Sequence, residues 1–296
     1  MIWLLTISGA LLIVVALRDI FHTLWHPGGF GILTRTVFAL TWRASKVRRG
    51  GARPSVIAGP LGILLTLGMW TSLVVIGFAL IYLPRLADDF NFSSSLQPGQ
   101  SSNLSFALYV SFVAVTTLGL GDVTPATPEL RLVVPVEALL GFLLLTAGIS
   151  WILQLYPALN RRRALARRLS SMRRQQVDQI VETGQACVAA QQLEAVRDEL
   201  ATVEMDLRQY AESYYFREDR ADISLAATLP YVEQLVDAGK RSASPDVQVA
   251  AAALGDGLDE ILQLLRDQYL PKARGSESTF AALIDDHRQS QARADD

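Results

Sequence analysis

Residues 107–125 read ALYVSFVAVTTLGLGDVTP. They lie in and after a short apolar segment, residues 104–115, which runs into two threonines, two glycines and an acid. A helix needs about 20 apolar residues to cross the roughly 30 Å core of a bilayer, so this segment is too short to span it. A non-spanning segment is tolerated at membrane depth only where protein surrounds it. The stretch therefore predicts a re-entrant helix at 104–115 followed by a glycine-bearing loop at 116–122.

Three longer apolar runs surround this loop in the sequence and predict membrane-spanning helices. They are Ile2–Ala16, Ser55–Leu83 and Leu132–Leu159, in a chain whose residues are 50% hydrophobic. We therefore expect an all-α membrane protein. Its expected parts are an additional N-terminal transmembrane helix at 1–26, a basic cytoplasmic or interfacial connector at 27–54, a module at 55–159 with spans 55–84 and 131–159, and a helical cytosolic domain at 160–296.

Charge is distributed unevenly along the 296 residues. Met1–Arg174 carries 16 Lys and Arg against 6 Asp and Glu, whereas Gln175–Asp296 carries 11 against 23. The basic residues gather in 27–54 and directly after the third apolar run, while the loop 85–131 is mainly acidic. By the positive-inside rule, the N-terminus lies outside and the C-terminal half lies in the cytoplasm. The expected location is a cell membrane, in bacteria the inner one.

The composition also limits the partners. The basic residues flank apolar runs and form no separate basic face, so we expect membrane lipid and no nucleic acid as a partner. The single cysteine, Cys187, excludes a disulfide framework within the chain. The C-terminal half holds one histidine, His287, and no catalytic set or phosphate loop, so we expect neither an enzyme nor a bound cofactor. A cytosolic regulator is not identifiable from the sequence.

The loop 116–122 has the residue types that ion selection by backbone carbonyls requires. Such a filter replaces the hydration shell of the ion with carbonyl oxygens from several identical loops. Consecutive carbonyls point to one axis only if the backbone alternates between left- and right-handed dihedrals. Glycine adopts the left-handed ones without steric cost, which accounts for Gly119 and Gly121. Thr117 can add a hydroxyl at the inner mouth and Asp122 a negative charge at the outer mouth. The alternative is a tight turn between two membrane helices.

Together with its flanking spans, this stretch resembles the pore module of potassium channels. There, a pore helix with aromatic residues precedes Thr-Val-Gly-Tyr-Gly-Asp and a nearby proline. The resemblance covers roughly Ser55–Leu159 and implies a homotetramer with K⁺ as the permeant ion. It also implies a gating hinge at Gly141, and Gly148 is a second expected bending point. The expected ion-binding carbonyls belong to Thr117, Leu118, Gly119, Leu120 and Gly121.

The chain departs from the family pattern at Leu120, which stands where the family has tyrosine. In relatives the tyrosine hydroxyl tethers the filter to aromatic residues of the pore helix, and leucine has no hydroxyl. We expect Leu120 to pack against Tyr109 and Phe112 instead, which gives a softer and less selective filter. Such channels also exist with leucine at this position, so the departure is compatible with conduction.

Glu137 is the single charge within the third apolar run. A charge inside a span costs about 2.5–3.5 kcal/mol on insertion scales, so it should face protein and have a partner. We expect Glu137 to support the filter from behind by hydrogen bonding to pore-helix or filter groups such as Thr116. The alternative is a place near the outer interface with Arg131 or water as its partner.

Asp19, His22 and His26 follow one another at i, i+3 and i+7 near the end of the first span. Histidine and carboxylate ligands suit zinc or a similar ion, so a metal site is a weak possibility. Polar anchors at the membrane interface are the favoured explanation. The adjacent Arg18 also disfavours a bound cation.

The connector 27–54 has apolar residues at helical spacing between its arginines. This pattern predicts either a helix in the inner interface or a short linker, and the sequence does not decide between them.

The C-terminal half has a helical pattern throughout. A heptad seam there fits either a coiled coil between subunits or packing on later helices of the same chain. Further helices are expected at 223–238, 245–266 and 279–291, separated by linkers at 241–244 and 275–278. The seam consists of Leu193, Val196, Leu200, Val203, Leu207, Tyr210 and Tyr214.

The function expected from these features is a potassium-selective, homotetrameric channel gated through the inner part of the third span by the helical cytosolic domain. A weakly selective cation channel and a non-conducting membrane sensor or scaffold are the alternatives.

Overall fold

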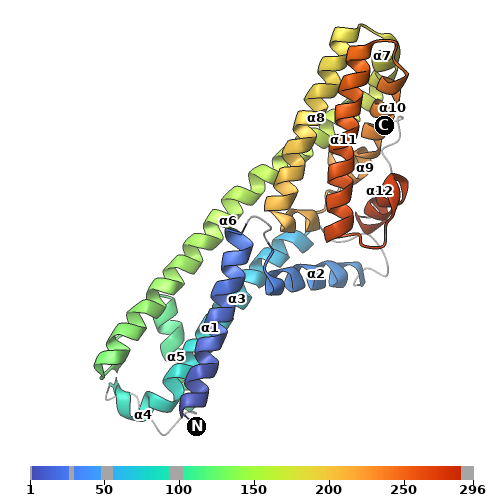
Figure 1. Ribbon diagram of the computed structural model, residues 1–296. Helices are drawn as coiled ribbons and strands as arrows, with labels where there is room; N and C mark the ends of the chain where they lie inside the picture. Colours follow the sequence, from blue (N-terminus) through green and yellow to red (C-terminus); the bar gives the residue numbers. More distant parts are fainter. Residues whose placement is uncertain (1, 27–29, 48–55, 94–102, 288–296) are drawn as a thin grey trace. The chain divides into compact units, whose positions relative to one another are not determined.

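The structure is a computed structural model that describes residues 2–26, 30–47, 56–93 and 103–287. The chain forms two compact units (Figure 1). The membrane unit comprises Met1–His26, Phe30–Val37 and Gly62–Leu153, and the C-terminal unit comprises Pro27–Gly29, Phe38–Leu61 and Gln154–Asp296. Almost all of the described structure is helical. The predicted all-α membrane fold class is confirmed.

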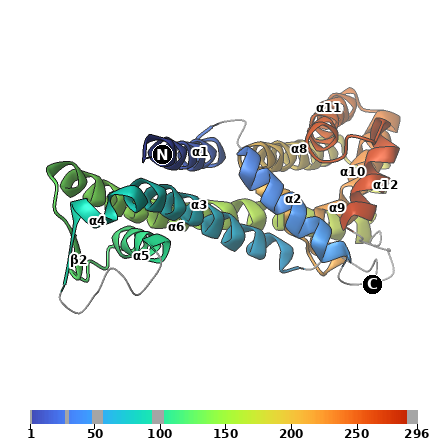
Figure 2. The ribbon, with the colours of Figure 1, turned by 90° about the horizontal axis from the view of Figure 1, so that it is seen from below.

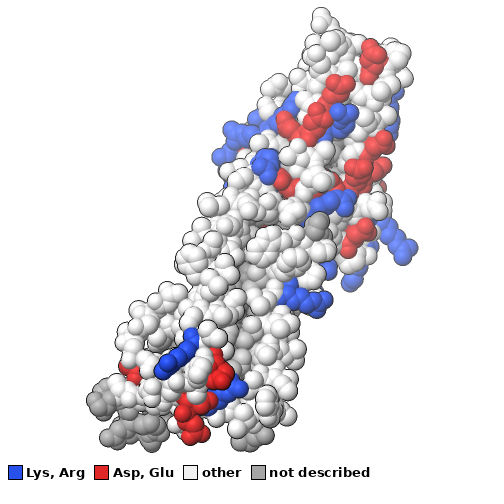
Figure 3. Space-filling view, turned by 60° about the vertical axis from the view of Figure 1, so that its left-hand side comes forward, with Lys and Arg blue, Asp and Glu red and all other residues white. Residues whose placement is uncertain are grey.

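Three helices are long and apolar enough to cross a membrane. They are α1 (Ile2–Leu24), α3 (Ala58–Tyr82) and α6 (Pro128–Arg174). Figure 3 shows a broad band of uncharged surface on the membrane unit, with charged side chains gathered at one end of it. Such a band is what lipid contact requires, because charged groups are costly within the bilayer core.

α1 packs closely against α3 in the membrane unit. A Cβ atom added at Gly9 would lie 2.3 Å from the carbonyl oxygen of Gly77, and one added at Gly77 would lie 2.9 Å from that of Gly9. Small residues allow membrane helices to approach this closely, and van der Waals contact then stabilises the pair. The additional N-terminal helix is therefore an integral part of the membrane unit.

The re-entrant segment forms α5 (Asn103–Val115), which contacts both α3 and α6 (Figure 2). Two short strands, β1 (Phe90–Phe92) and β2 (Val123–Pro125), pair antiparallel on either side of it in sequence. Phe90 faces Pro125 in this register, and Phe92 faces Val123. The segment after α3 is thereby joined to the segment that follows the glycine-bearing loop.

The connector is helical at α2 (Ile32–Val47), so of its two interpretations the structure favours the helix. The rest of the predicted connector, residues 27–29 and 48–54, lies outside the described residues.

The C-terminal unit is a helical bundle built on the end of α6. Its elements are α7 (Val177–Thr183), α8 (Ala186–Gln209), η2 (Ala211–Tyr215), η3 (Ala221–Ile223), α9 (Leu225–Thr228), α10 (Pro230–Arg241), α11 (Pro245–Gln268) and α12 (Gly275–His287). α8 lies against α11 along most of its length (Figure 1). Leu193, Val196 and Leu200 of the heptad seam are fully buried within the single chain. The seam therefore packs on later helices of its own chain, and it is not available for a coiled coil between subunits.

Two predicted boundaries in this unit were wrong. The helix expected at 223–238 is divided by Pro230, which begins α10 and cannot donate a backbone hydrogen bond to a preceding turn. The linker expected at 275–278 is the first turn of α12, where Gly275 adopts φ +75° and begins the helix. The last predicted helical residues, 288–291, lie outside the described residues.

Candidate ion pathway

The loop after α5 turns back on the end of the helix. The backbone N–H of Thr116 donates to the carbonyl of Phe112, and that of Leu118 donates to the carbonyl of Val113 at 3.0 Å. Thr117 has φ +57°, Gly119 φ +56° and Gly121 φ +77°, while the residues between them have negative φ. The backbone thus alternates in hand from Thr117 to Gly121, as ion coordination by consecutive carbonyls requires.

Steric space does not explain the two glycines. A Cβ atom at Gly119 or Gly121 would meet nothing within 4 Å in this chain, so the positive φ angles are the reason for glycine. Thr117 adopts the same left-handed region with a β-branched side chain. A β-branched residue is rare in that conformation, and such strain gathers at functional sites. All residues from 117 to 121 are exposed, with Leu118 62% and Leu120 57% accessible.

Asp122 fixes the C-terminal end of this loop. Its carboxylate accepts a hydrogen bond from the hydroxyl of Tyr109 in α5 and another, at 3.0 Å, from the N–H of Val123. The carbonyl of Asp122 accepts from the N–H of Ser93 at 2.9 Å, beside the β1–β2 pair. An aromatic hydroxyl of α5 therefore tethers the loop through the acid that follows it.

The expected packing of Leu120 on Tyr109 and Phe112 stays a prediction. Phe112 is 52% exposed, like Leu120, and the Tyr109 hydroxyl bonds to Asp122. This tether was not predicted from the sequence, because in the family the tether starts from the tyrosine that Leu120 replaces. The signal was Tyr109 on the helix and an acid directly after the second glycine.

Glu137 lies fully buried behind the re-entrant helix and bridges three helices. It accepts hydrogen bonds from the hydroxyl of Tyr82 in α3 at 2.7 Å and from that of Ser111 in α5. Ser111 Oγ also lies 3.0 Å from the carbonyl of Val75 in α3. Glu137 thus binds a pore-helix group, as expected, but the group is Ser111.

The other groups considered as partners of Glu137 bond elsewhere. The hydroxyl of Thr116 donates to the carbonyl of Phe112 at 2.6 Å, and Arg131 donates to the carbonyl of Pro125 at 3.3 Å. The main partner outside the pore helix, Tyr82, was missed because nothing in the local pattern marks it.

Gly141 allows α6 to approach the end of α5. A Cβ atom at Gly141 would lie 1.9 Å from the carbonyl oxygen of Val115, the last residue of α5. A Cβ atom at Gly148 would lie 3.0 Å from a side-chain carbon of Leu67 in α3. Gly141 is therefore required for close packing under the loop, while hinge motion at either glycine stays a prediction. Both glycines line an apolar hollow of about 560 Å³ that also contains Thr116 and Thr117.

Asp19 joins three helices of the membrane unit. One carboxylate oxygen accepts from the N–H of Leu33 at 2.9 Å. The other accepts from the N–H and hydroxyl of Thr34 and from Trp70 Nε1 at 2.9 Å. These donors come from α2 and α3, so a residue of α1 holds both. The described residues contain no group of three side chains suited to a metal ion, so the structure adds no support to the predicted site at Asp19, His22 and His26.

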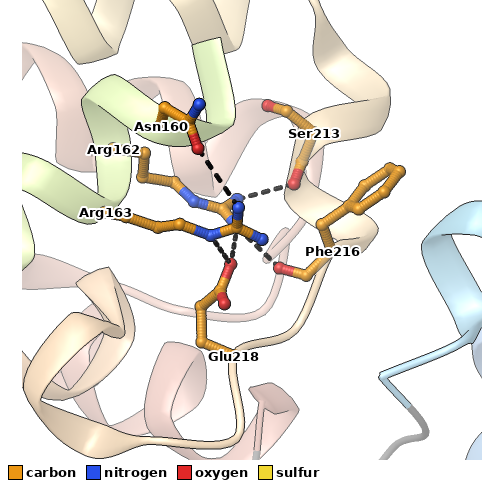
Figure 4. A network of polar contacts seen from close by, with 6 residues as sticks. All are labelled: Asn160, Arg162, Arg163, Ser213, Phe216 and Glu218. Carbon is orange, nitrogen blue, oxygen red and sulfur yellow. Dashed lines mark hydrogen bonds and ion pairs between the residues drawn. The ribbon is translucent and has the colours of Figure 1, made fainter. Parts of the chain in front are cut away.

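Within the C-terminal unit, arginines at the end of α6 make hydrogen bonds and ion pairs with the other elements of the bundle. The guanidinium of Arg162 is buried and donates to the carbonyls of Ser213 at 2.6 Å and Phe216 at 2.7 Å (Figure 4). Glu218 accepts from Arg163 at 2.8 Å and lies 3.4 Å from Arg162. Further ion pairs join Arg161 to Asp206, Arg167 to Asp222 and Arg168 to Glu199. We call Arg161, Arg162, Arg163, Arg167 and Arg168 the arginine cluster of α6.

The end of α2 meets α12 within the C-terminal unit. Asp286 accepts from Trp42 Nε1 at 3.0 Å, from Lys46 Nζ at 2.5 Å and from the Tyr214 hydroxyl at 2.8 Å. Burial acts to raise the pKa of Asp286, but these donors and the charge of Lys46 hold it below its usual value. Burial lowers the pKa of the neighbouring His287 to about 3, and its Nε2 atom has no hydrogen-bond partner in the described structure.

Comparison with known proteins agrees with this arrangement. Residues 68–156, which contain α5, the loop and the first part of α6, match the family model Ion_trans_2, described as an ion channel. A Bacillus subtilis (strain 168) protein described as "Uncharacterized membrane protein YdjJ" is 31% identical over 168 residues, which are 56% of this chain and 48% of that protein. The chain thus spans about half the length of the curated relative it matches. No solved structure matches. These findings support an ion-channel domain in a membrane protein.

Proposed function

We propose that the chain is one subunit of a homotetrameric, potassium-selective channel, with carbonyls of residues 117–121 as the ion ligands. The observation that carries the proposal is the alternation of φ at Thr117, Gly119 and Gly121 in an exposed loop held between α5 and α6. A tight turn needs neither this alternation nor a threonine in the left-handed region. A carbonyl filter needs the alternation.

The exposed side of α6 supports the proposed assembly into a ring. In its most apolar window only 11% of residues are buried, against 44% in α3. Leu139, Phe142 and Leu145 are each more than half exposed next to the loop. One loop supplies only part of a coordination shell, so several copies must meet at a common axis. By resemblance to potassium channels, four copies meet there.

Gating by the C-terminal unit is the second part of the proposal. α6 continues without interruption from the membrane unit into the arginine cluster. Arg162 is buried and bonded to two carbonyls, so motion of the segment Ser213–Glu218 acts directly on the helix. We expect this unit, on the cytoplasmic side, to change the position of α6 and thereby open or close the pathway.

A weakly selective cation channel is the second candidate, and Leu120 favours it. A leucine there gives the filter no hydroxyl of its own, and the tether of Tyr109 acts only at Asp122. A filter that is less firmly held distinguishes ions of similar size less sharply.

A flux assay in liposomes tests both candidates. Purified full-length protein is reconstituted with potassium inside, and efflux is compared with that of sodium from matched vesicles. Potassium selectivity predicts fast potassium efflux, little sodium efflux, and loss of both in Gly121→Ala, since alanine disfavours φ +77°. Equal rates for both ions favour the weakly selective channel. No flux of either ion contradicts the channel proposal and favours a sensor or scaffold.

A further inference from the structure

Arg18 is a charged residue on a membrane helix that has no ionic partner in the described part of the chain. It is exposed on α1 directly beside Asp19, but the oxygens of Asp19 are occupied by Leu33, Thr34 and Trp70. An arginine near the end of a span reaches toward the interface, where it needs an anion or water. The protein thus leaves one positive charge unpaired at a defined place.

Arg18 borders a hollow of about 440 Å³ between α1 and the beginning of α2. Val15, Arg18 and His22 stand on one side of α1 at i, i+3 and i+7 and line it together with Asp19. Phe30, Gly31, Ile32 and Leu33 line it from the other side. The hollow therefore combines a polar edge, formed by Arg18 and His22, with apolar walls.

This combination fits an amphiphile with an anionic head. A guanidinium binds a phosphate oxygen through charge-assisted hydrogen bonds, and an imidazole can add another donor. Val15, Ile32 and Leu33 offer apolar contact to a hydrocarbon chain next to that head. A fully water-soluble anion would use the polar edge and leave these walls unused.

We propose that the hollow between α1 and α2 is a binding site for an anionic phospholipid, with the phosphate on Arg18 and His22 and an acyl chain along Val15 and Ile32. The site is independent of ion conduction. Since α2 is held to α1 through Asp19, the bound lipid contacts both helices and stabilises their junction.

The test measures lipid binding to the full-length protein in mild detergent by native mass spectrometry. Phosphatidylglycerol is the anionic probe and phosphatidylcholine of the same chain length is the zwitterionic control. We expect the anionic lipid to bind about tenfold more tightly, because the choline cation of the control lipid offsets the attraction between its phosphate and Arg18. Arg18→Gln should remove this difference and Arg18→Lys should keep most of it. Glycerol 3-phosphate in solution should not displace the lipid.

Two further variants separate the site from general attraction to basic residues. Arg43→Gln removes another exposed arginine, on α2 but away from the hollow, and should leave the tenfold preference intact. Val15→Phe fills the apolar wall and should weaken lipid binding with Arg18 still present.

Four results would overturn the proposal. They are unchanged binding in Arg18→Gln, equal loss in Arg43→Gln, an equal affinity of both lipids, and displacement by glycerol 3-phosphate, which would identify a soluble-anion site.

Discussion

The two units differ in how far their apolar side chains are exposed. In the C-terminal unit the seam of α8 is buried against α11, with Leu193 and Leu200 at 0% exposure in the single chain. In the membrane unit, α6 leaves Leu139 56% and Phe142 59% exposed. The C-terminal bundle thus completes its core alone, whereas the membrane unit requires lipid or further copies. The polar contacts differ as well, since buried carboxylates join the membrane helices and arginines join α6 to the bundle.

The largest effect is expected from Gly141→Ala. The added Cβ would overlap the carbonyl of Val115, so α6 must move away from the end of α5 and the loop above it loses its support. Potassium flux in liposomes should fall to background. Gly68→Ala is the matched control in a membrane helix, because a Cβ there meets nothing within 4 Å, and it should retain flux. Equal activity of the two variants would contradict the packing role of Gly141.

A pair of leucine variants compares the two units directly. Leu200→Ala should destabilise the C-terminal unit by about 2–5 kcal/mol, the usual loss for a fully buried leucine. Leu139→Ala should leave the fold of each chain intact and weaken the oligomer. Hydrogen exchange of α8 amides measures the first effect in the full-length protein, and mass photometry measures the second. The comparison would be contradicted if Leu139→Ala made the α8 amides exchange faster. It would also be contradicted if the oligomer dissociated in Leu200→Ala and not in Leu139→Ala.

Tyr82→Phe tests the carboxylate that joins the membrane helices. It removes one of the two side-chain donors to buried Glu137, and a buried acceptor left without its partner costs about 1–3 kcal/mol. We expect a lower unfolding temperature in detergent. Tyr156→Phe, at an exposed tyrosine of α6, should not change it. Glu137→Gln keeps the shape and should lose less than Glu137→Leu. If all these variants melt like the original protein, Glu137 does not hold the helices together.

The smallest effect concerns pH and His287. Its pKa is lowered to about 3 from 6.5, because the buried imidazole resists protonation while the unfolded chain accepts a proton. Stability of α12 is therefore complete above pH 6.5 and declines as the pH falls toward 3, by about 1 kcal/mol per pH unit. Lys46, Arg162 and Arg217 also oppose the proton, and Asp286 favours it.

Hydrogen exchange of α12 amides, corrected for the intrinsic pH dependence of exchange, measures this decline between pH 7 and pH 4.5. About two pH units of this range lie below the pKa of an unfolded histidine. His287→Phe should flatten the slope, and Asp285→Asn, at an exposed neighbouring acid, should leave it unchanged. Asp286 adds a loss only near and below its ordinary pKa of 3.8, which lies below this range. A slope that survives in His287→Phe would assign the effect to another group.

The sequence predicted those parts of the structure that local pattern determines. The re-entrant helix was expected at 104–115 and lies at Asn103–Val115, because its length, apolar character and following glycines act within one segment. The left-handed backbone at Gly119 and Gly121 was likewise predicted from the sequence, since a positive φ angle favours glycine. Contacts between distant segments were not. Tyr82 and Glu137 are 55 residues apart and Asp19 and Trp70 are 51 apart, and no periodicity marks such partners.

The heptad of α8 illustrates a different limit. A repeating apolar face indicates that something covers it, but it does not identify the cover. Residues of α11, including Leu258 and Ile261, form a second apolar face at helical spacing and are buried in the same bundle, but neither face names the other as its partner. Only the three-dimensional arrangement assigns the seam to its own chain.

The β1–β2 pair has a mechanical consequence for the glycine-bearing loop. Its paired residues, with the bonds from Ser93 to Asp122 and from Ala126 to Asp89, join the stretch 89–93 to the stretch 122–126 as one ribbon. Tension applied to either strand is transmitted to the other without passing through a helix. A molecule that binds this ribbon, such as an antibody fragment, would therefore pull on the loop 116–122 without contacting the loop itself.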